Sequence, residues 1–219
     1  MVPTLPSSRR CSVDSVTSER GASGTKLTSV KIVIAGGFGA GKTTFVGSVS
    51  EIRPLTTEAV MTTASSEHDD LSGLPNKTTT TVAMDFGRIS LDRDLILYLF
   101  GTPGQHRFWF MWDDLVRGAI GAVVLVDTRR LADCFPAVDY FEQCGLPYTV
   151  ALNCFDGTQP YTTDDVREAL QIDAAVPILL CDARDRESTK SALITLVEHT
   201  MARVYASTAG PPAIPRPRW

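Results

Sequence analysis

Short apolar segments alternate with amphipathic segments along most of the chain. The first apolar segment, "VKIVIA", is rich in β-branched residues, which is typical of a strand buried in a sheet. The turn-like sequence "SLDRD" predicts that the second and third segments form a pair of neighbouring strands. The predicted strands cover residues 30–35, 82–89, 95–100, 119–127, 147–153 and 176–181.

Segments with helical spacing separate these strands. The last of them is long and places Leu193, Leu196, Val197 and Val204 on one spaced face. This alternation predicts an α/β fold, a doubly wound and mostly parallel sheet of about six strands with helices on both faces. In such sheets ligands bind at the carboxyl ends of the strands. The predicted helices cover residues 42–52, 105–118, 131–144, 162–171 and 187–206.

The length of 219 residues allows one α/β domain with a full core and is too short for two domains of ordinary size. Both ends of the chain have the composition of tails, because the first is rich in Ser, Thr, Gly and Arg and the last is rich in Pro. We therefore expect a disordered N-terminal tail over residues 1–28, one domain over 29–207 and a Pro-rich C-terminal tail over 208–219.

The net charge of the chain is −4, and because each predicted tail carries +2, the domain between them carries −8. An acidic domain argues against nucleic acid as the main ligand, since a phosphate backbone needs a basic surface. The sequence has no apolar run long enough to span a bilayer and no lipid-anchor motif. The five cysteines lack C-x-x-C spacing, which fits reduced cytosolic thiols. We expect a cytoplasmic protein that reaches a membrane only through a partner.

The strongest motif is "GGFGAGKT", which matches G-x-x-x-x-G-K-[ST] directly after the first strand and opens a helix. Glycines let successive backbone N–H groups turn towards a phosphate, Lys42 reaches the β- and γ-oxygens, and the hydroxyl of Thr43 binds Mg²⁺. The N-terminus of the following helix also favours an anion. We therefore predict a site for a nucleoside di- or triphosphate, formed by Gly36, Gly37, Gly39, Ala40, Gly41, Lys42, Thr43 and Thr44.

Two later motifs at the ends of predicted strands concern the base. In "ALNCFD", Asn153 and Asp156 have a spacing that resembles the N-K-x-D element of GTPases. The resemblance implies that Asp156 pairs with N1 and the exocyclic amine of guanine. A carboxylate there has no suitable partner on adenine, and polar mismatches of this kind discriminate strongly. The later "CDAR" resembles the loop that contacts guanine O6, which implies base contacts from Asp182, Ala183 and Arg184.

The segment "LYLFGTPGQHRF" combines a strand with a loop that resembles the D-x-x-G-Q segment of small GTPases. With the other motifs, it identifies a resemblance to Ras-like P-loop GTPases over residues 30–206. The resemblance is more narrowly to the prokaryotic MglA type, and most narrowly to the actinobacterial conservon GTPases. The narrow features are "TTTTVAMDFG", "FGTPGQHRFWFMWD" and "CDARDR".

This resemblance implies roles for several residues. Gln105 would orient the attacking water, and Lys42 and Thr81 would also take part in catalysis. Thr81 would bind Mg²⁺ in the triphosphate state, and Gly104 would belong to the nucleotide site. Any member of the threonine run 78–81 could be that ligand.

The resemblance also implies protein partners, because conservon GTPases are encoded beside roadblock/LC7-type proteins and sensor-kinase-like proteins. In "HRFWFMWDD" five large apolar side chains follow one another, and one helical face cannot bury them all. The exposed remainder would mark a nucleotide-sensitive interface. Arg107 is either a surface arginine or an internal arginine finger.

Two positions depart from the GTPase pattern. Cys154 stands in the base site in place of a lysine whose stem packs over the purine, so base binding is expected to weaken. Gly101 replaces an aspartate that usually holds a Mg²⁺-bound water, so we expect a loosened metal shell. Asp85 could substitute, but four residues beyond Thr81 it would lie about 13 Å along an ideal strand and could help only if that strand shifts. It could equally be a polar residue on a sheet edge.

Three functions remain under consideration. The first is a switch that binds GTP and GDP with Mg²⁺, hydrolyses GTP slowly and shows two states to an effector in a bacterial signalling system. The second is a guanine-nucleotide-binding scaffold with negligible hydrolysis. The third, an ATP-using P-loop kinase or ATPase, is disfavoured by Asp156 and by the lack of a lid-like arginine cluster. The sequence favours the first.

Overall fold

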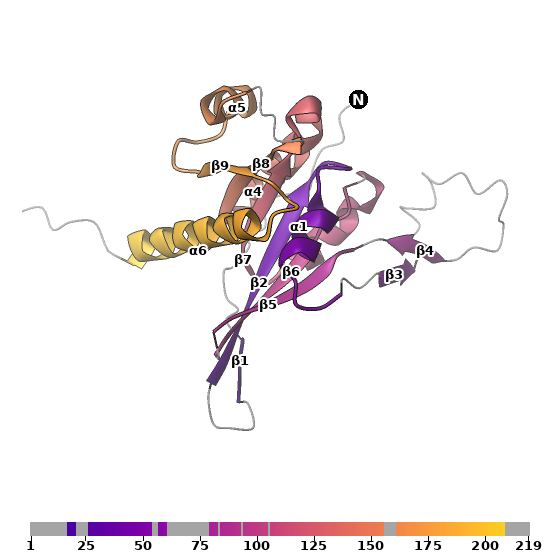
Figure 1. Ribbon diagram of the computed structural model, residues 1–219, viewed down its shortest axis with the longest axis vertical. Coiled ribbons are helices and arrows are strands. Elements are labelled where there is room, and N and C mark those ends of the chain that lie inside the picture. Colours follow the sequence, from indigo (N-terminus) through magenta and orange to yellow (C-terminus); the bar gives the residue numbers. More distant parts are fainter. Residues whose placement is uncertain are drawn as a thin grey trace, which may run out of the picture.

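A mostly parallel sheet forms the centre of the protein (Figure 1). The structure is a computed structural model, and it describes residues 17–20, 26–53, 57–60, 79–82, 84–92, 94–104, 106–155 and 161–208. In this part of the chain six strands follow the order β5-β6-β2-β7-β8-β9, and β1 pairs with β2 from outside that path. The predicted fold class is confirmed. The strands of this sheet are β1 (Thr17–Arg20), β2 (Lys26–Gly36), β5 (Phe86–Asp92), β6 (Leu95–Gly101), β7 (Ala119–Val126), β8 (Tyr148–Asn153) and β9 (Ile178–Cys181).

The central strands are parallel and buried. β2 lies between β6 and β7, and the ladder continues through β8 to β9, always with parallel pairing. Every residue of β8 is buried, and so is every residue of β7 except Ile120. Strands covered on both faces need continuous apolar sequences, which is why these two segments show no alternation of polar and apolar residues. The sheet becomes antiparallel where β5 pairs with β6 and where β1 pairs with β2.

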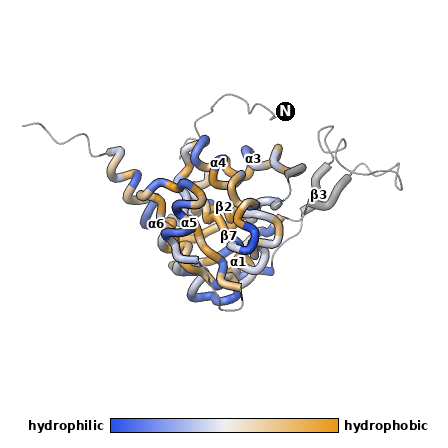
Figure 2. The backbone as a smooth tube through the Cα atoms, turned by 90° about the horizontal axis from the view of Figure 1, so that it is seen from above, coloured by the Kyte–Doolittle hydropathy of each residue, from blue (hydrophilic) through white to orange (hydrophobic). Residues whose placement is uncertain are grey.

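Helices cover both faces of the sheet. On one face α1 and α6 pack their buried side chains, among them Phe45 and Leu196, into one apolar cluster with the strands. On the other face α3, α4 and α5 contribute Trp112, Phe141 and Val166 to a second cluster. Figure 2 shows β2 and β7 between α1 and the pair α3 and α4. The helices are α1 (Lys42–Val49), α3 (Trp112–Val116), α4 (Phe135–Cys144), α5 (Thr163–Leu170) and α6 (Arg186–Thr208), with the 3₁₀ segments η1 (His106–Met111) and η2 (Thr128–Cys134).

Two predicted helices are each divided in two. The segment 105–118 forms η1 followed by the short α3, and the segment 131–144 forms the end of η2 followed by α4. In the second case Pro136 lies in the first turn of α4. A separate interruption lies further upstream, within η2, where the backbone of Arg130 is not helical, with φ −138° and ψ 51°. Proline is favoured at the start of a helix and not within one, which explains the division before α4.

The predicted strand 82–89 is also divided. β4 (Thr79–Val82) pairs with β3 (Thr57–Val60) in a separate two-stranded sheet, and β5 begins only at Phe86. At the other end of the domain, strand pairing begins before the predicted boundary at residue 29, since β2 starts at Lys26 and is joined by β1. Among the described helices, none combines the length and apolar character that a membrane span requires.

Candidate nucleotide-binding site

A glycine-rich loop joins the end of β2 to the start of α1. Gly36 has φ +137°, and a Cβ at this position would overlap the carbonyl oxygen of Leu125 in β7. Gly41 has φ +102°, and a Cβ there would lie 2.5 Å from Nδ2 of Asn153. Both positions need glycine, because its backbone adopts positive φ without strain and leaves room for a close neighbour. The sequence therefore folds here into a tight loop at the carboxyl end of the sheet, as the motif predicted.

Lys42 lies across this loop. Its Nζ donates hydrogen bonds to the carbonyl oxygens of Gly36 and Gly37, at 2.9 and 2.6 Å, and the residue is only 8% exposed. Burial lowers the pKa of Lys42 to about 8, against the opposing effect of the nearby Asp85 carboxylate. The ammonium group is thus held over the loop backbone, where it can meet a phosphate without a large movement.

Asp85 lies at the same place as Thr43 and Gly101. The hydroxyl of Thr43 donates to Oδ2 of Asp85 at 2.7 Å, and the N–H of Gly101 donates to the backbone carbonyl of Asp85, also at 2.7 Å. A Cβ at position 101 would stand 3.0 Å from the Cβ of Asp85 and 3.1 Å from its Oδ2. The Asp85 carboxylate therefore lies beside the point from which a side chain at 101 would project.

We expected Asp85 to reach this place only through a shift of its strand, and that expectation is wrong. The expectation was based on the distance from Thr81 to Asp85 along one strand, whereas the position of Asp85 is decided by its pairing with β6. Phe86 of β5 pairs with Phe100 of β6, so the antiparallel register sets Asp85 opposite Gly101 without any shift. Long-range strand pairing, which the linear spacing does not contain, decides the position.

Asn153 connects the phosphate loop to the ends of two strands. Its Nδ2 donates to the carbonyl of Ala40 at 3.0 Å, and its Oδ1 accepts from the N–H of Ala183 at 3.1 Å. Next along the chain, the N–H of Cys154 donates to the carbonyl of Cys181 at 2.7 Å. The N-x-x-D and C-D-A-R motifs are therefore brought together beside the loop, as their positions at strand ends predicted.

The turn after β9 is closed by its own side chains. Arg184 donates from Nε and Nη2 to the two carboxylate oxygens of Asp182, both at 3.0 Å, and its backbone N–H donates to Oδ1 at 2.9 Å. These hydrogen bonds hold the pKa of Asp182 below its usual value. Ala183, between them, is 1% exposed, so its contribution to a ligand would come from the backbone.

Several predicted site residues lie outside the described part of the chain. Gln105 and Asp156 belong to this group. For Thr81 the structure gives the backbone, which pairs with Glu58 in the β3–β4 sheet, and nothing of the side chain. Their roles remain predictions. Of the aromatic run after Gln105, Phe108 and Trp112 are buried, at 5% and 2%, while Phe110 is 43% exposed. The expectation that this run is partly exposed is therefore confirmed for the described residues.

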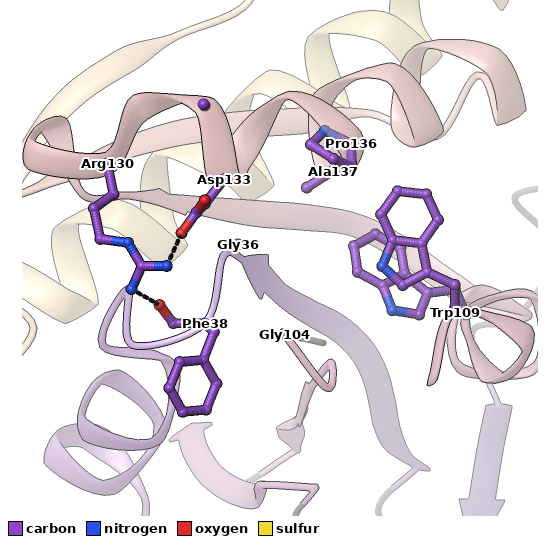
Figure 3. Close-up of a pocket in the computed structure, with 10 residues that line it drawn as sticks. Gly36, Phe38, Gly104, Trp109, Arg130, Asp133, Pro136 and Ala137 are labelled. Atoms are coloured by element: carbon purple, nitrogen blue, oxygen red, sulfur yellow. Dashed lines mark hydrogen bonds and ion pairs between the residues drawn. The ribbon is translucent and has the colours of Figure 1, made fainter. Parts of the chain in front are cut away.

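The motifs in the sequence do not predict the side-chain cluster that follows the end of β7. Asp127 there binds Arg129, whose guanidinium carbon lies 3.9 Å from the ring centroid of Phe155. Arg130 points to the phosphate loop, where it donates to the carbonyl of Phe38 at 3.4 Å. A pocket of about 340 Å³ lies next to this contact, and Figure 3 shows Arg130 and Phe38 on one side of it and Trp109 on the other. The only sequence signal was an acidic residue at a strand end.

The residues present fit a magnesium ion bound together with a phosphate. In the described chain no three His, Cys, Asp or Glu side chains form a metal-binding cluster. Mg²⁺ in phosphate sites takes few ligands from the protein and completes its shell with phosphate oxygens and waters. One hydroxyl, that of Thr43, with one carboxylate beside it, that of Asp85, is consistent with that kind of site.

Comparison with known proteins supports nucleotide binding. The model of a family described as "Conserved hypothetical ATP binding protein" matches residues 34–203. An uncharacterized protein of Methanocaldococcus jannaschii is 27% identical over 133 residues, which are 60% of this chain and 73% of that protein.

Among solved structures, the G domain of the FeoB iron transporter of T. maritima aligns with a TM-score of 0.55 and 14% identity, over 78% of this chain and 98% of that one. The cytosolic domain of the same transporter, in its GDP form I, aligns with a TM-score of 0.56 and 14% identity, over 80% of this chain and 64% of that one. At this identity the likeness shows the fold alone, which is that of a P-loop GTPase domain.

Proposed function

The chain belongs to the P-loop family described as conserved hypothetical ATP-binding proteins, and from this premise we propose that it is a small GTPase. In this proposal the protein binds GTP and GDP with Mg²⁺, hydrolyses GTP slowly, and acts as a nucleotide-dependent switch in a bacterial signalling system. The observation that carries the proposal is the position of Asn153, which ties the phosphate loop at Ala40 to the C-D-A-R turn at Ala183.

The choice of guanine departs from the family's description and rests on the base-site motifs. In this structure the N–H of Ala183 donates to Oδ1 of Asn153 next to the phosphate loop. In the proposal this N–H turns from that oxygen to guanine O6 when the base binds. Asp156, three residues after Asn153, is proposed to pair with the guanine N1 and amine groups. Neither an O6 acceptor nor an N1 donor exists on adenine, so the same constellation would reject ATP.

Hydrolysis is assigned to residues around the γ-phosphate. Lys42, whose ammonium group already lies over the loop, would neutralise the charge that develops on the phosphate oxygens. Thr43 and Thr81 would hold Mg²⁺, which stabilises the same charge when bound. Gln105 would orient the attacking water, and the Asp85 carboxylate would accept a hydrogen bond from a metal-bound water in place of an aspartate at position 101.

A scaffold without hydrolysis remains the second candidate. It is supported by Cys154, which cannot cover a purine face as a lysine stem does. Asp85 weighs against it, because a carboxylate beside Thr43 removes the argument for an inactive site that rests on Gly101. The proposed partners are a roadblock/LC7-type protein and a sensor-kinase-like complex of the MglA and conservon type, with the exposed Phe110 in η1 as a contact candidate.

The nucleotide that co-purifies with the protein, followed by phosphate release from GTP and from ATP with and without Mg²⁺, tests the proposal. Bound GDP and Mg²⁺-dependent release from GTP alone are expected. Bound guanine nucleotide without release would favour the scaffold, and release from ATP would assign the protein to the ATP-using class that its family description names.

A further inference from the structure

Two consecutive arginines at the start of η2 contact opposite halves of the proposed nucleotide site. The segment follows the end of β7, between the phosphate loop after β2 and the turn after β8. Arg129 contacts Phe155, in the turn that precedes Asp156, whereas Arg130 contacts Phe38 in the phosphate loop. One short segment therefore touches both parts of the chain that a nucleotide would join.

Arg129 is fixed on two sides. Its Nε and Nη2 donate to Oδ1 and Oδ2 of Asp127 at 2.9 and 2.8 Å, and its backbone N–H donates to Oδ1 at 3.0 Å. The Asp127 side chain is 9% exposed, and the hydrogen bonds from Arg129 hold its pKa below the usual value. Because the Asp127 carboxylate already holds the Arg129 guanidinium in place, this group loses little further conformational freedom when it stacks on the ring of Phe155. The contact with Phe155 is therefore preorganised.

The turn that carries Phe155 is held from two sides. On its far side the N–H of Cys154 binds the carbonyl of Cys181, which fixes the turn to β9. On the near side the Arg129–Phe155 stack fixes it to the end of β7. Cys154 and Phe155 are thus held between two strands. The residue that follows them in the sequence is the one proposed to distinguish guanine from adenine.

Arg130 braces the phosphate loop instead. Its Nη1 donates to the carbonyl of Phe38 at 3.4 Å, and its Nη2 forms an ion pair of 2.5 Å with Asp133 (Figure 3). Asp133 in turn packs against the loop, because a Cβ on Gly37 would stand 2.5 Å from the Cβ of Asp133. The backbone of Arg130 is not helical. The side chains of these two consecutive arginines contact different segments of the chain.

We propose that Arg129 and Arg130 are positioning residues with separate tasks: Arg129 holds the base-binding turn and sets the preference for guanine, while Arg130 holds the phosphate loop and sets affinity for the diphosphate. The proposal rests on the proposed function, since it needs a nucleotide in this site. It assigns neither arginine a direct contact with the ligand.

Displacement of a fluorescent GDP analogue by GDP, ADP and pyrophosphate tests this division of tasks in the full chain. Arg129→Ala should weaken GDP roughly three- to tenfold, the range of a partly exposed cation–π contact, and leave ADP and pyrophosphate unchanged. Arg130→Ala should weaken all three by one common factor. Arg117→Ala is the matched control and should change nothing, because the Arg117 side chain forms an exposed ion pair with the equally exposed Asp114.

Conservative variants separate positioning from loss of fold. Phe155→Tyr keeps a ring beneath the guanidinium and should retain the wild-type ratio of GDP affinity to ADP affinity. Phe155→Leu removes the ring and should lower this ratio by the same factor as Arg129→Ala. Adding Arg129→Ala to Phe155→Leu should then cost nothing more. An unchanged ratio in Arg129→Ala, with guanine still preferred by the wild type, overturns this inference alone. A wild type without preference for guanine overturns the proposed function itself.

Discussion

The hydroxyl of Thr43 donates a 2.7 Å hydrogen bond to Oδ2 of Asp85, and this bond joins the first turn of α1 to the residue before β5. The same carboxylate stands beside Gly101, where a Cβ would approach its Oδ2 to 3.1 Å. A P-loop hydroxyl and a carboxylate are thus adjacent although the residue at the expected sequence position is glycine. The acidic group comes from the neighbouring strand, and the glycine leaves the space that it needs.

Asp85→Asn should weaken Mg²⁺-dependent binding of GDP. The carboxylate is proposed to accept a hydrogen bond from a metal-bound water, and charge-assisted bonds of this kind contribute about 1.5–3 kcal/mol. The affinity for GDP at saturating Mg²⁺ should therefore fall roughly ten- to a hundredfold. GDP release rates, followed during a Mg²⁺ titration, report this loss. Asp139→Asn, on the exposed side of α4, should leave those rates unchanged.

Gly101→Asp should not tighten the metal site in the wild-type background. Its Cβ would stand 3.0 Å from the Cβ of Asp85, and two carboxylates would compete for one place. Combined with Asp85→Gly, the same substitution should recover part of the lost Mg²⁺ dependence. Tighter Mg²⁺ binding by Gly101→Asp alone would show that Asp85 does not fill this role.

Local sequence patterns predicted the fold well. They predicted the site less completely, because they contain no information on which distant residues strand pairing brings together. The strands around "VKIVIA" and the loop "GGFGAGKT" were found because their signals lie within a few residues. Asp85 was placed too far from the site because its neighbour in space is Gly101, which only the β5–β6 register reveals. The Arg129–Phe155 stack was not foreseen, since it joins the ends of β7 and β8 through side chains alone.

Gly36→Ala and Gly39→Ala should differ strongly in their effect on stability. Both positions have positive φ, which costs a non-glycine residue roughly 1–2 kcal/mol. A Cβ at Gly36 would also overlap the carbonyl oxygen of Leu125, while nothing lies within 4 Å of one at Gly39. Overpacking of that kind typically costs about 1–3 kcal/mol more. Urea unfolding followed by circular dichroism gives both values, and equal losses would contradict this description of the loop.

Thiol labelling should report occupation of the base site. Burial raises the pKa of Cys134 to about 12 and that of Cys181 to about 11, so neither should form a reactive thiolate at pH 8. Cys154 and Cys144 are partly exposed and should react. GDP at ten or more times its Kd should slow labelling of Cys154 about tenfold and leave Cys144 as the control. Peptide mass spectrometry resolves each site, and equal protection of the two would argue against a base beside Cys154.

Gln105→Leu should separate hydrolysis from binding. A glutamine that orients water acts in the transition state, so its loss should lower the single-turnover rate of GTP hydrolysis roughly a hundredfold while GTP and GDP affinities stay nearly unchanged. Gln143→Leu, on the exposed surface of α4, is the matched control and should keep the wild-type rate. Lys42→Ala should behave in the opposite way and impair binding itself, because its ammonium group is held over the phosphate loop by Gly36 and Gly37. If Gln105→Leu and the wild type hydrolyse GTP at the same rate, Gln105 has no catalytic role, and the protein would be the guanine-nucleotide scaffold instead of the switch.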